Sequence, residues 1–184
     1  MLKKSPLYTK SGDCGETGLI GVARISKASD LIEAIGAVDE LNAILGTVLA
    51  LGCAKKAHKI IREMQENLFH FGAELASCFA NQVCRKISEK DVEKLEKHID
   101  DLDASLPPLK NFILPGGGTV GSMLHMGRAV CRRAERSIIR FSKAKKLKLN
   151  PALIKYINRL SDLLFVLARH ENNASKKKEV VWRG

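Results

Sequence analysis

The sequence predicts an all-α protein, a five-helix bundle preceded by a glycine-rich N-terminal segment. Apolar residues recur every three to four positions through long stretches of the 184-residue chain, and clusters of proline, glycine or polar residues separate these stretches. Long helices joined by short loops pack as antiparallel neighbours, which makes a bundle. The apolar content of 45% excludes a chain that is mainly disordered.

Residues 1–28 do not follow a helical pattern and predict a loop with short hairpin strands. Glycines let backbone N–H groups approach a ligand closely, while hydroxyls add donors and lysines add charge, as in a phosphate cradle. The spacing matches neither GxxxxGK[ST] nor GxGxxG, so an ordinary glycine-rich turn also explains it. The residues concerned are Gly12, Gly15, Gly18 and Gly21, the hydroxyls of Thr9, Ser11 and Thr17, and the lysines Lys10 and Lys27.

The helical stretches carry their own start and stop signals. Ser88 followed three residues later by Asp91 predicts a capped start. Asn150 before Pro151 places a capping residue ahead of a proline at the first helical position. Nothing marks a domain boundary, so we expect one domain over 1–184, with a loop at 1–28, a bundle at 29–173 and a basic tail at 174–184. The expected helices cover 29–52, 55–80, 88–106, 119–144 and 150–173.

The charge of the chain is concentrated in its second half. Residues 1–100 carry 14 basic and 14 acidic side chains, whereas residues 101–184 carry 17 basic and 6 acidic ones and account for the whole net charge of +11. Such an asymmetry indicates a polyanionic partner, which could be nucleic acid, an acidic membrane or a phosphate-rich small molecule. A solvated basic surface without a specific partner is the alternative. Four of the arginines lie inside the fourth expected helix: Arg128, Arg132, Arg133 and Arg136.

The patterns of cysteine, histidine and hydropathy indicate which further classes of protein can be set aside. Five scattered cysteines without a CxxC pair indicate reduced thiols in a cytoplasmic protein. The five histidines are well separated, so we expect no protein-bound transition metal. No run of about 18 apolar residues occurs, and the N-terminus lacks the apolar stretch of a signal peptide. We therefore expect no membrane span.

Several polar residues lie where a bundle helix needs none. Arg128, Arg132 and Glu135 are spaced at i, i+4 and i+7, so they share one face of the fourth helix. Each polar residue could simply face solvent on an amphipathic helix, but together they could line one cationic cleft. The others are Asp39 and Glu40 in the first helix, and Asn158, Arg159, Ser161 and Asp162 in the fifth.

Three groups of segments resemble one known family over nearly the whole chain. They are YTKSGD and TGL within residues 8–19, AVDELN at 37–42, and the set FILPGG, CRRAER and NRLSDLLF between residues 112 and 165. In order and spacing they resemble the PduO-type ATP:cob(I)alamin adenosyltransferases. The resemblance implies a ferritin-like five-helix bundle that forms a homotrimer with active sites between subunits. It implies transfer of the 5′-deoxyadenosyl group of ATP, with Mg²⁺, to the cobalt of cob(I)alamin.

The resemblance also implies roles for individual residues. Arg128 and Arg132 match the two family arginines and Glu135 the glutamate, with Arg128 pairing with Asp39 across a subunit boundary. Asn158 matches the asparagine near the nucleotide. The ATP-binding segment corresponds to Thr9, Lys10, Ser11, Gly12, Thr17, Gly18 and Lys27, and the aromatics beside the corrin ring correspond to Phe112 and Trp182.

The sequence departs from the family pattern at two positions, and two alternative functions remain open. Cys14 replaces a lysine of the family loop, which weakens phosphate binding unless Lys10 and Lys27 suffice, and His70 replaces an aspartate. The same fold could act mainly as a carrier that delivers adenosylcobalamin to a dependent enzyme, with a reductase as a second partner. A basic helical module that binds nucleic acid is the alternative from another class, although the resemblance implies no nucleic acid. Steep salt dependence of tight DNA binding would favour that module.

Overall fold

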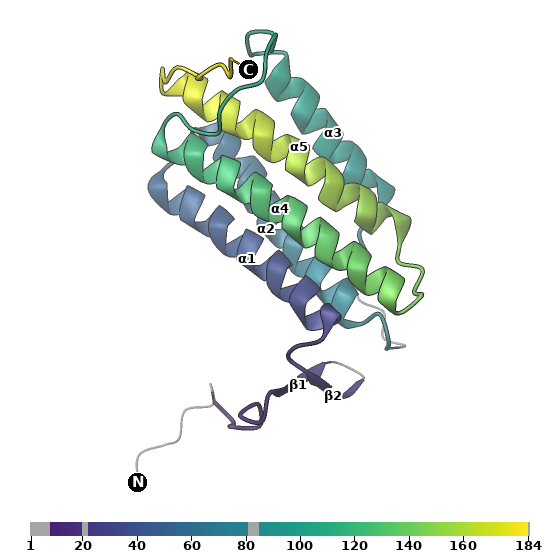
Figure 1. The fold of residues 1–184 in the computed structure, drawn as a ribbon. Coiled ribbons are helices and arrows are strands. Elements are labelled where there is room, and N and C mark those ends of the chain that lie inside the picture. Colours follow the sequence, from purple (N-terminus) through teal and green to yellow (C-terminus); the bar gives the residue numbers. More distant parts are fainter. Residues whose placement is uncertain (1–7, 20–21, 81–84, 184) are drawn as a thin grey trace.

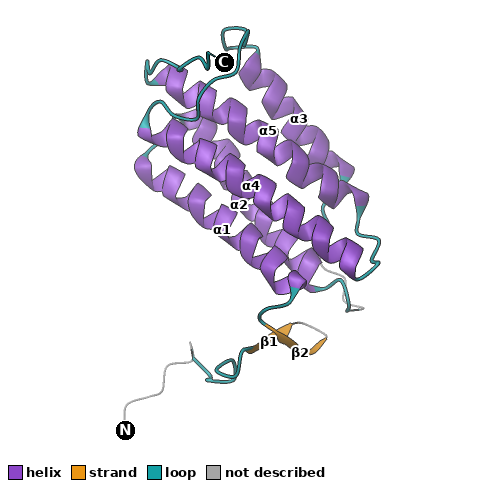
Figure 2. Ribbon diagram, viewed as in Figure 1, coloured by secondary structure: helices purple, strands orange, loops and turns teal. Residues whose placement is uncertain are grey.

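The computed structural model describes residues 8–19, 22–80 and 85–183, and in these ranges it shows five helices and one small hairpin (Figures 1 and 2). The predicted all-α bundle with a non-helical N-terminal segment is confirmed. The elements are β1 (Glu16–Leu19), β2 (Val22–Ser26), α1 (Asp30–Leu51), α2 (Lys55–Ala76), α3 (Glu89–Asp103), α4 (Thr119–Ala144) and α5 (Pro151–Ala174).

The helices pack around a shared apolar core. Helix α4 lies between α1 and α5, α2 lies along α1, and α3 lies along α5 (Figure 1). Gly127 lets α4 approach α1 closely, because a side chain there would already touch Ile44 at 3.4 Å. The predicted apolar stripe of the fifth helix is buried as expected: Leu153, Ile157, Leu160, Leu164 and Leu167.

The predicted helix starts are present. The Ser29 side chain accepts a hydrogen bond from the Ile32 amide, and the Asn150 side chain accepts one from the Ala152 amide. Ser88 and Asp91 form the reciprocal capping box that their spacing predicts. Burial alone would raise the pKa of Asp91, but hydrogen bonds from Ser88 together with the Arg85 guanidinium lower it. The carboxylate is therefore held ionised at the start of α3.

The predicted end of the second helix is wrong. Helix α2 ends at Ala76, whereas its apolar pattern predicted Ala80. The Ser77 hydroxyl donates to the carbonyl of Ala73 at 2.8 Å, and such side-chain bonds compete with the continuing helix ladder. The basic C-terminal segment is also more than a tail, because Ile113 and Val181 form an antiparallel bridge between distant parts of the chain.

The hairpin projects beyond one end of α1 (Figure 1). Its strands are antiparallel, with Glu16 opposite Ser26 and Thr17 opposite Ile25. Arg24 fastens the hairpin through a hydrogen bond to the carbonyl of Glu16 at 3.0 Å. Leu19 and Ile25 of the hairpin pack against the apolar core, so the strands connect the glycine-rich loop to the bundle.

Helix α1 is the one described helix that is long and apolar enough to cross a membrane by length and composition. Core helices of bundles pass the same test. Its residues Leu31, Leu41 and Leu45 are at most 1% exposed, and Asp39 and Glu40 are exposed on the opposite side. Helix α1 therefore contributes these buried side chains to the bundle core.

Candidate functional site

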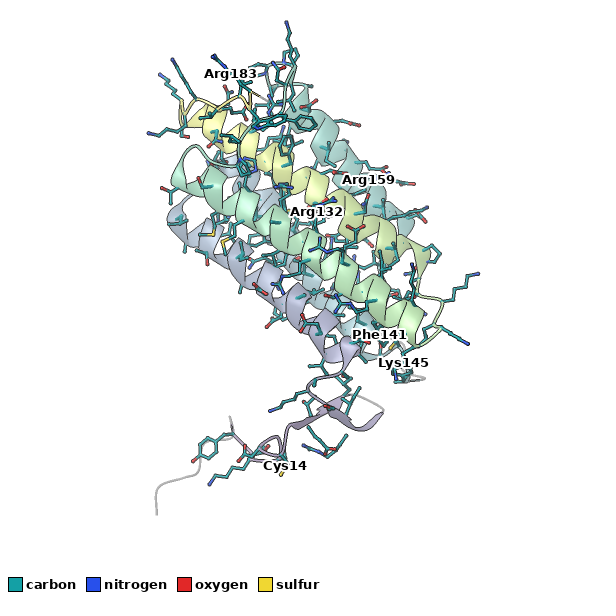
Figure 3. The ribbon with its side chains drawn as sticks, viewed as in Figure 1. Cys14, Arg132, Phe141, Lys145, Arg159 and Arg183 are labelled. Carbon is teal, nitrogen blue, oxygen red and sulfur yellow. The ribbon has the colours of Figure 1, made fainter. Side chains whose placement is uncertain are left out.

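The polar face predicted on α4 is present and extends to α5. The carboxylate of Glu135 accepts a hydrogen bond from the Asn158 amide at 3.0 Å, so these two predicted site residues lie together. Arg132 is exposed and lies midway along the bundle (Figure 3). Arg128 lies one turn before it and is half-buried. The structure thus gathers four of the predicted residues on adjoining faces of two helices.

The two predicted arginines of this face have no carboxylate partner, whereas Arg133 and Arg159 beside them do. Within the described residues Arg128 and Arg132 make no ion pair, and the Nε of Arg128 is buried without a hydrogen-bond partner. Arg133 instead pairs with Glu40 of α1, and Arg159 pairs with Glu96 of α3 at 2.8 Å. Arg128 and Arg132 are therefore among the cations of α4 that are left for a ligand or for another subunit.

His125 lies beside this face and was expected only to be structural or at the surface. Its side chain is 3% exposed, and neither ring nitrogen has a hydrogen-bond partner among the described residues. The ring packs against Phe165 with centroids 5.8 Å apart. Burial lowers the pKa of His125, and the charge of Arg128 lowers it further. A neutral imidazole therefore lies next to Arg128.

Asp39 lies on another surface. Its exposed side chain lines a groove of about 430 Å³ between α1 and α2, whose walls are mostly apolar and include Ile35, Leu68 and the 72% exposed Phe69. Asp39 makes no ion pair within the described part of the chain. One chain therefore does not bring Asp39 and Arg128 together, and their predicted pairing needs a second subunit.

The glycine-rich loop is ordered by local hydrogen bonds. Thr9 and Ser11 share a hydroxyl hydrogen bond of 2.7 Å, and the Lys27 ammonium donates to the carbonyl of Gly12 at 2.9 Å. A side chain at Gly12 would lie 3.1 Å from the Lys27 nitrogen, so glycine allows this approach. Lys10 adopts the left-handed region at φ 60°, which marks a tight turn.

This loop does not meet the arginine face in one chain. Figure 3 shows Cys14 at the far end of the hairpin segment and Arg132 on the body of the bundle. Thr17 and Gly18 lie on β1, next to the loop, so they belong to the same separate unit. The predicted nucleotide residues are therefore grouped in two places, the loop with β1 and the α4–α5 face.

The predicted aromatics lie together at the opposite end of the bundle. Phe112 is 78% exposed, which excludes the core plug that a lone phenylalanine before a turn usually forms. Its ring meets Trp182 edge-on, with centroids 6.3 Å apart and planes at 72°. The Trp182 amide donates to the carbonyl of Phe112 at 2.8 Å. The two rings line a hollow of about 490 Å³ with Leu109, Lys110 and Asn111.

A larger hollow of about 630 Å³ lies between the end of α2 and the α4–α5 loop. Its one buried carboxylate, Glu74, already accepts hydrogen bonds from the amide of Ile87 at 2.7 Å and from Asn150 at 2.9 Å. These bonds join the segment before α3 to the start of α5, which is a structural role. Among residues 8–19, 22–80 and 85–183, no three His, Cys, Asp or Glu side chains cluster as metal ligands would.

Comparison with known proteins identifies the group of proteins to which this arrangement belongs. The family model described as cobalamin adenosyltransferase matches residues 7–171. The chain belongs to the cobalamin adenosyltransferase family. A corrinoid adenosyltransferase of Mycobacterium leprae is 36% identical over 96% of this chain and 95% of its own length. The PduO protein of Citrobacter freundii, named a corrinoid adenosyltransferase, is 37% identical over 95% of this chain, which spans only 52% of that relative.

A solved structure supports the same assignment. A variant of the PduO-type ATP:corrinoid adenosyltransferase from Lactobacillus reuteri, complexed with cobalamin and ATP, has a TM-score of 0.89 and 33% identity, with 97% of each chain covered. The resemblance inferred from the sequence motifs is thus confirmed, and so is the five-helix fold.

Two buried residues near the aromatic end were missed by the sequence analysis. Arg169 and Asn172 are 4% and 1% exposed, yet both are polar and lie in the last turns of α5. Polar residues at a helix end normally face solvent, so their positions alone gave no signal. Their helical spacing from the buried Val166 and Ala168, at i+3 and i+4, was the available clue.

Proposed function

We propose that this adenosyltransferase family member transfers the 5′-deoxyadenosyl group of ATP to the cobalt of cob(I)alamin, giving adenosylcobalamin and triphosphate. One observation carries the proposal: Arg128 and Arg132 have no ion pair in the described chain and adjoin the hydrogen-bonded Glu135 and Asn158. Unpaired cations beside hydrogen-bonding groups fit a polyanionic substrate. The solved relative complexed with cobalamin and ATP supports the choice of substrates.

The reaction needs alignment and charge stabilisation more than acid–base catalysis. The electron pair of Co(I) attacks C5′, a Co–C bond forms, the C5′–O bond breaks, and its electron pair leaves on the triphosphate. No proton has to move at the reacting carbon. Arg132 stabilises the negative charge that develops on the leaving group, and Asn158 and Glu135 orient the nucleotide. A face without a nucleophile–base pair is sufficient for this chemistry.

The N-terminal loop supplies the other nucleotide contacts in the proposal. Thr9, Ser11 and Lys10 contribute hydroxyl and ammonium donors, and Gly12 offers accessible backbone. Lys27 already contacts this loop and takes the place of the lysine that Cys14 replaces. Mg²⁺ enters as part of the MgATP substrate, held mainly by the phosphates. Thr17 and Gly18 on β1 complete this set.

The two groups of nucleotide residues come together in a homotrimer. Asp39 lies at the α1–α2 groove and Arg128 on α4, so an ion pair between them joins two different surfaces of neighbouring subunits. Contacts between unlike surfaces close into a ring when the rotation permits. A threefold ring is the closure that the family resemblance implies. The exposed Phe69 in the same groove also gains burial there.

Phe112 and Trp182 form the corrinoid side of the proposed site. Their exposed rings can lie against the lower face of the corrin and exclude a lower ligand from the cobalt. Reduction of Co(II) to Co(I) is easier without that ligand. A reductase supplies the electron and an adenosylcobalamin-dependent enzyme receives the product, both in the cytoplasm. Free thiols at Cys14, Cys53, Cys78 and Cys131 are consistent with that compartment.

The alternatives receive less support. A nucleic-acid module would use the exposed Arg132, Arg136 and Arg140 of α4, which make no ion pair in the described chain, whereas the curated relatives and the solved neighbour are named corrinoid adenosyltransferases. A carrier would bind adenosylcobalamin without making it. A carrier would use the same hollow beside Phe112 and Trp182 as the enzyme, so only an activity measurement separates the two functions.

An anaerobic assay with ATP, Mg²⁺ and chemically reduced cobalamin tests the function. We expect the cob(I)alamin absorbance to disappear, with one triphosphate and one adenosylcobalamin formed per cobalamin consumed. Binding of adenosylcobalamin without turnover would indicate the carrier. Neither binding nor turnover, together with tight DNA binding that weakens steeply with salt, would favour the nucleic-acid module.

A further inference from the structure

The end of α5 carries buried polar residues that the proposed chemistry does not use. Arg169 and Asn172 lie three residues apart and are almost fully buried. Burying such groups is costly unless their hydrogen bonds are satisfied. Both are satisfied by segments outside the helices, so these two residues determine how those segments are fixed.

The Arg169 guanidinium joins three parts of the chain. Its Nε donates to both carboxylate oxygens of Glu179, at 3.2 and 3.3 Å, in the C-terminal segment. Its Nη2 donates to the carbonyl of Pro107 at 2.8 Å, in the α3–α4 loop, and its Nη1 lies 3.4 Å from Asp103 at the end of α3. Both non-helical segments are therefore tied to α5 at one point.

The same two segments are joined again a few residues further on. The Leu114 amide donates to the carbonyl of Val180, and the Trp182 amide donates to that of Phe112, both at 2.8 Å. The loop and the C-terminal segment lie at the same end of the bundle (Figure 2). Arg169 and these two backbone hydrogen bonds together hold the α3–α4 loop against the C-terminal segment. Phe112 and Trp182 project from these two segments.

Asn172 fixes the far end of the loop. Its side chain donates to the carbonyl of Gly116 and accepts from the amide of Gly118, both at 2.9 Å. Gly117 has φ +108°, and a side chain there would lie 2.3 Å from Asn172, so only glycine fits. The loop that carries Phe112 is thus held on both sides by α5.

We propose that Arg169 is a positioning residue for the corrinoid side of the site. By holding Glu179 and Pro107 together it fixes the directions of Phe112 and Trp182, and these rings determine how completely the lower face of the corrin is shielded. If the loop were not tethered, the exposed aromatic ring would have to be ordered at each binding event. The entropy lost in that ordering would weaken its contact with the corrin. The inference rests on the proposed function, and Arg169 acts through the two rings.

Glu179→Ala is the best test, because it removes the contact of the C-terminal segment with Arg169 while Arg169 keeps its bond to Pro107. Glu89→Ala is the matched control, since Glu89 also pairs with a cation of α5, Lys155 at 2.9 Å, and is half exposed. Trp182 is the single tryptophan of the sequence, so its fluorescence reports on the segment without any substrate. We expect acrylamide to quench Trp182 more strongly in Glu179→Ala, toward the value for free tryptophan, and to quench the control as it quenches the unchanged protein.

Activity gives the second readout. Starting from cob(II)alamin and a chemical reductant, Glu179→Ala should lose about tenfold in turnover, the factor that corresponds to one charge-assisted hydrogen bond. With pre-reduced cob(I)alamin the loss should be much smaller, and KM for ATP should not change. The electron paramagnetic resonance spectrum of bound cob(II)alamin should keep the nitrogen splitting of its lower ligand. Glu179→Gln, which retains an acceptor, should recover part of the activity.

The outcomes separate the inference from the function on which it rests. Unchanged quenching and unchanged cob(II)alamin turnover in Glu179→Ala would overturn the positioning role. Equal losses in both assays with a lower thermal midpoint would also overturn it, because they indicate a purely structural contact. If the unchanged protein does not convert cob(I)alamin, the proposed function fails, and the quenching data still show whether Glu179 holds the segment.

Discussion

Some arginines on the helices of this chain have a carboxylate partner and others do not. Arg133 pairs with Glu40, and Arg159 with Glu96. Arg132 is exposed on the same helix as Arg133 and has no such partner in the described chain. Its removal should therefore leave the fold intact, since surface substitutions without packed contacts usually change stability little.

We expect Arg132→Ala to lower turnover about 10²–10³-fold with an unchanged thermal midpoint, because one contact to the developing charge of the leaving group is lost. Arg62→Ala, which removes an exposed arginine of α2, is the control and should turn over normally. Steady-state assays and thermal unfolding of both variants measure this. Near-normal turnover of a folded Arg132→Ala protein would make Arg132 an ordinary surface residue.

His125 gives the stability of the protein a pH dependence. Because burial lowers its pKa below 6.5, the native state keeps the ring neutral while the unfolded chain takes up a proton. The contribution is fully present above pH 6.5 and is lost as pH falls toward the native pKa, at about 1.4 kcal/mol per pH unit in that window. When the free energy of unfolding is measured with urea at pH values from 8 to 5, it should fall less steeply with decreasing pH for His125→Leu than for the unchanged protein. Identical slopes would mean that His125 is not the group responsible.

Single residues also show where sequence reasoning stops. The motifs around Arg128 and Phe112 are local, so their presence could be predicted from the sequence. The exposure of Phe112 could not, because it depends on a ladder with Val180 and Trp182, about seventy positions away in the chain. Arg169 was missed for the same reason, since its partners come from three distant segments.

At the scale of elements, the helical period predicted all five helices, because each buries a continuous apolar face. The boundaries were less certain where side chains compete with the backbone, as Ser77 does at the end of α2. The pairing of residues 112–114 with 180–182 has no local signal at all. Strand pairing depends on a partner, and a three-residue stretch such as Val180–Trp182 gives no period to detect.

The start of α4 is fixed by contact with α5. A side chain at Gly121 would lie 2.1 Å from the Asn172 side chain, closer than atoms can pack. We expect Gly121→Ala to destabilise the protein by about 1–3 kcal/mol, although alanine normally favours a helix over glycine. In the background of Asn172→Ala the same change should cost much less, because the clash is gone. Thermal or urea unfolding of the unchanged protein, the two single variants and the double variant gives the coupling energy between the two positions. Strict additivity of the two changes would show that the residues do not compete for space.

At the scale of the whole molecule, the proposed site is divided among surfaces that one chain keeps apart. The hairpin segment with Cys14 projects beyond α1, Arg132 lies on the body of the bundle, and the C-terminal segment with Arg183 lies at the other end (Figures 1 and 3). Phe112 is hydrogen-bonded to Trp182 of that segment. Assembly of several copies of the chain would bring the loop of one subunit to the arginine face of another. The sequence motifs predicted these groups, but only the fold shows that they do not meet within one chain.

The charges of Asp39 and Arg128 provide the test of that assembly. Asp39→Arg and Arg128→Asp should each weaken the trimer, because each places like charges opposite one another at the interface. The double variant restores an opposite pair and should sediment as a trimer again. Glu40→Ala is the neighbouring control and should not change sedimentation, since Glu40 pairs with Arg133 of its own chain.

Activity and assembly separate in the double variant. Arg128 belongs to the proposed nucleotide face, so the restored trimer should still turn over poorly, whereas the Glu40→Ala trimer should be active. Sedimentation velocity at micromolar concentration distinguishes the 20.3 kDa chain from three times that mass. If the unchanged protein sediments as a monomer, or if both single variants sediment as the unchanged trimer does, Asp39 and Arg128 do not pair between subunits. The unpaired arginines would then need a ligand alone to balance their charge.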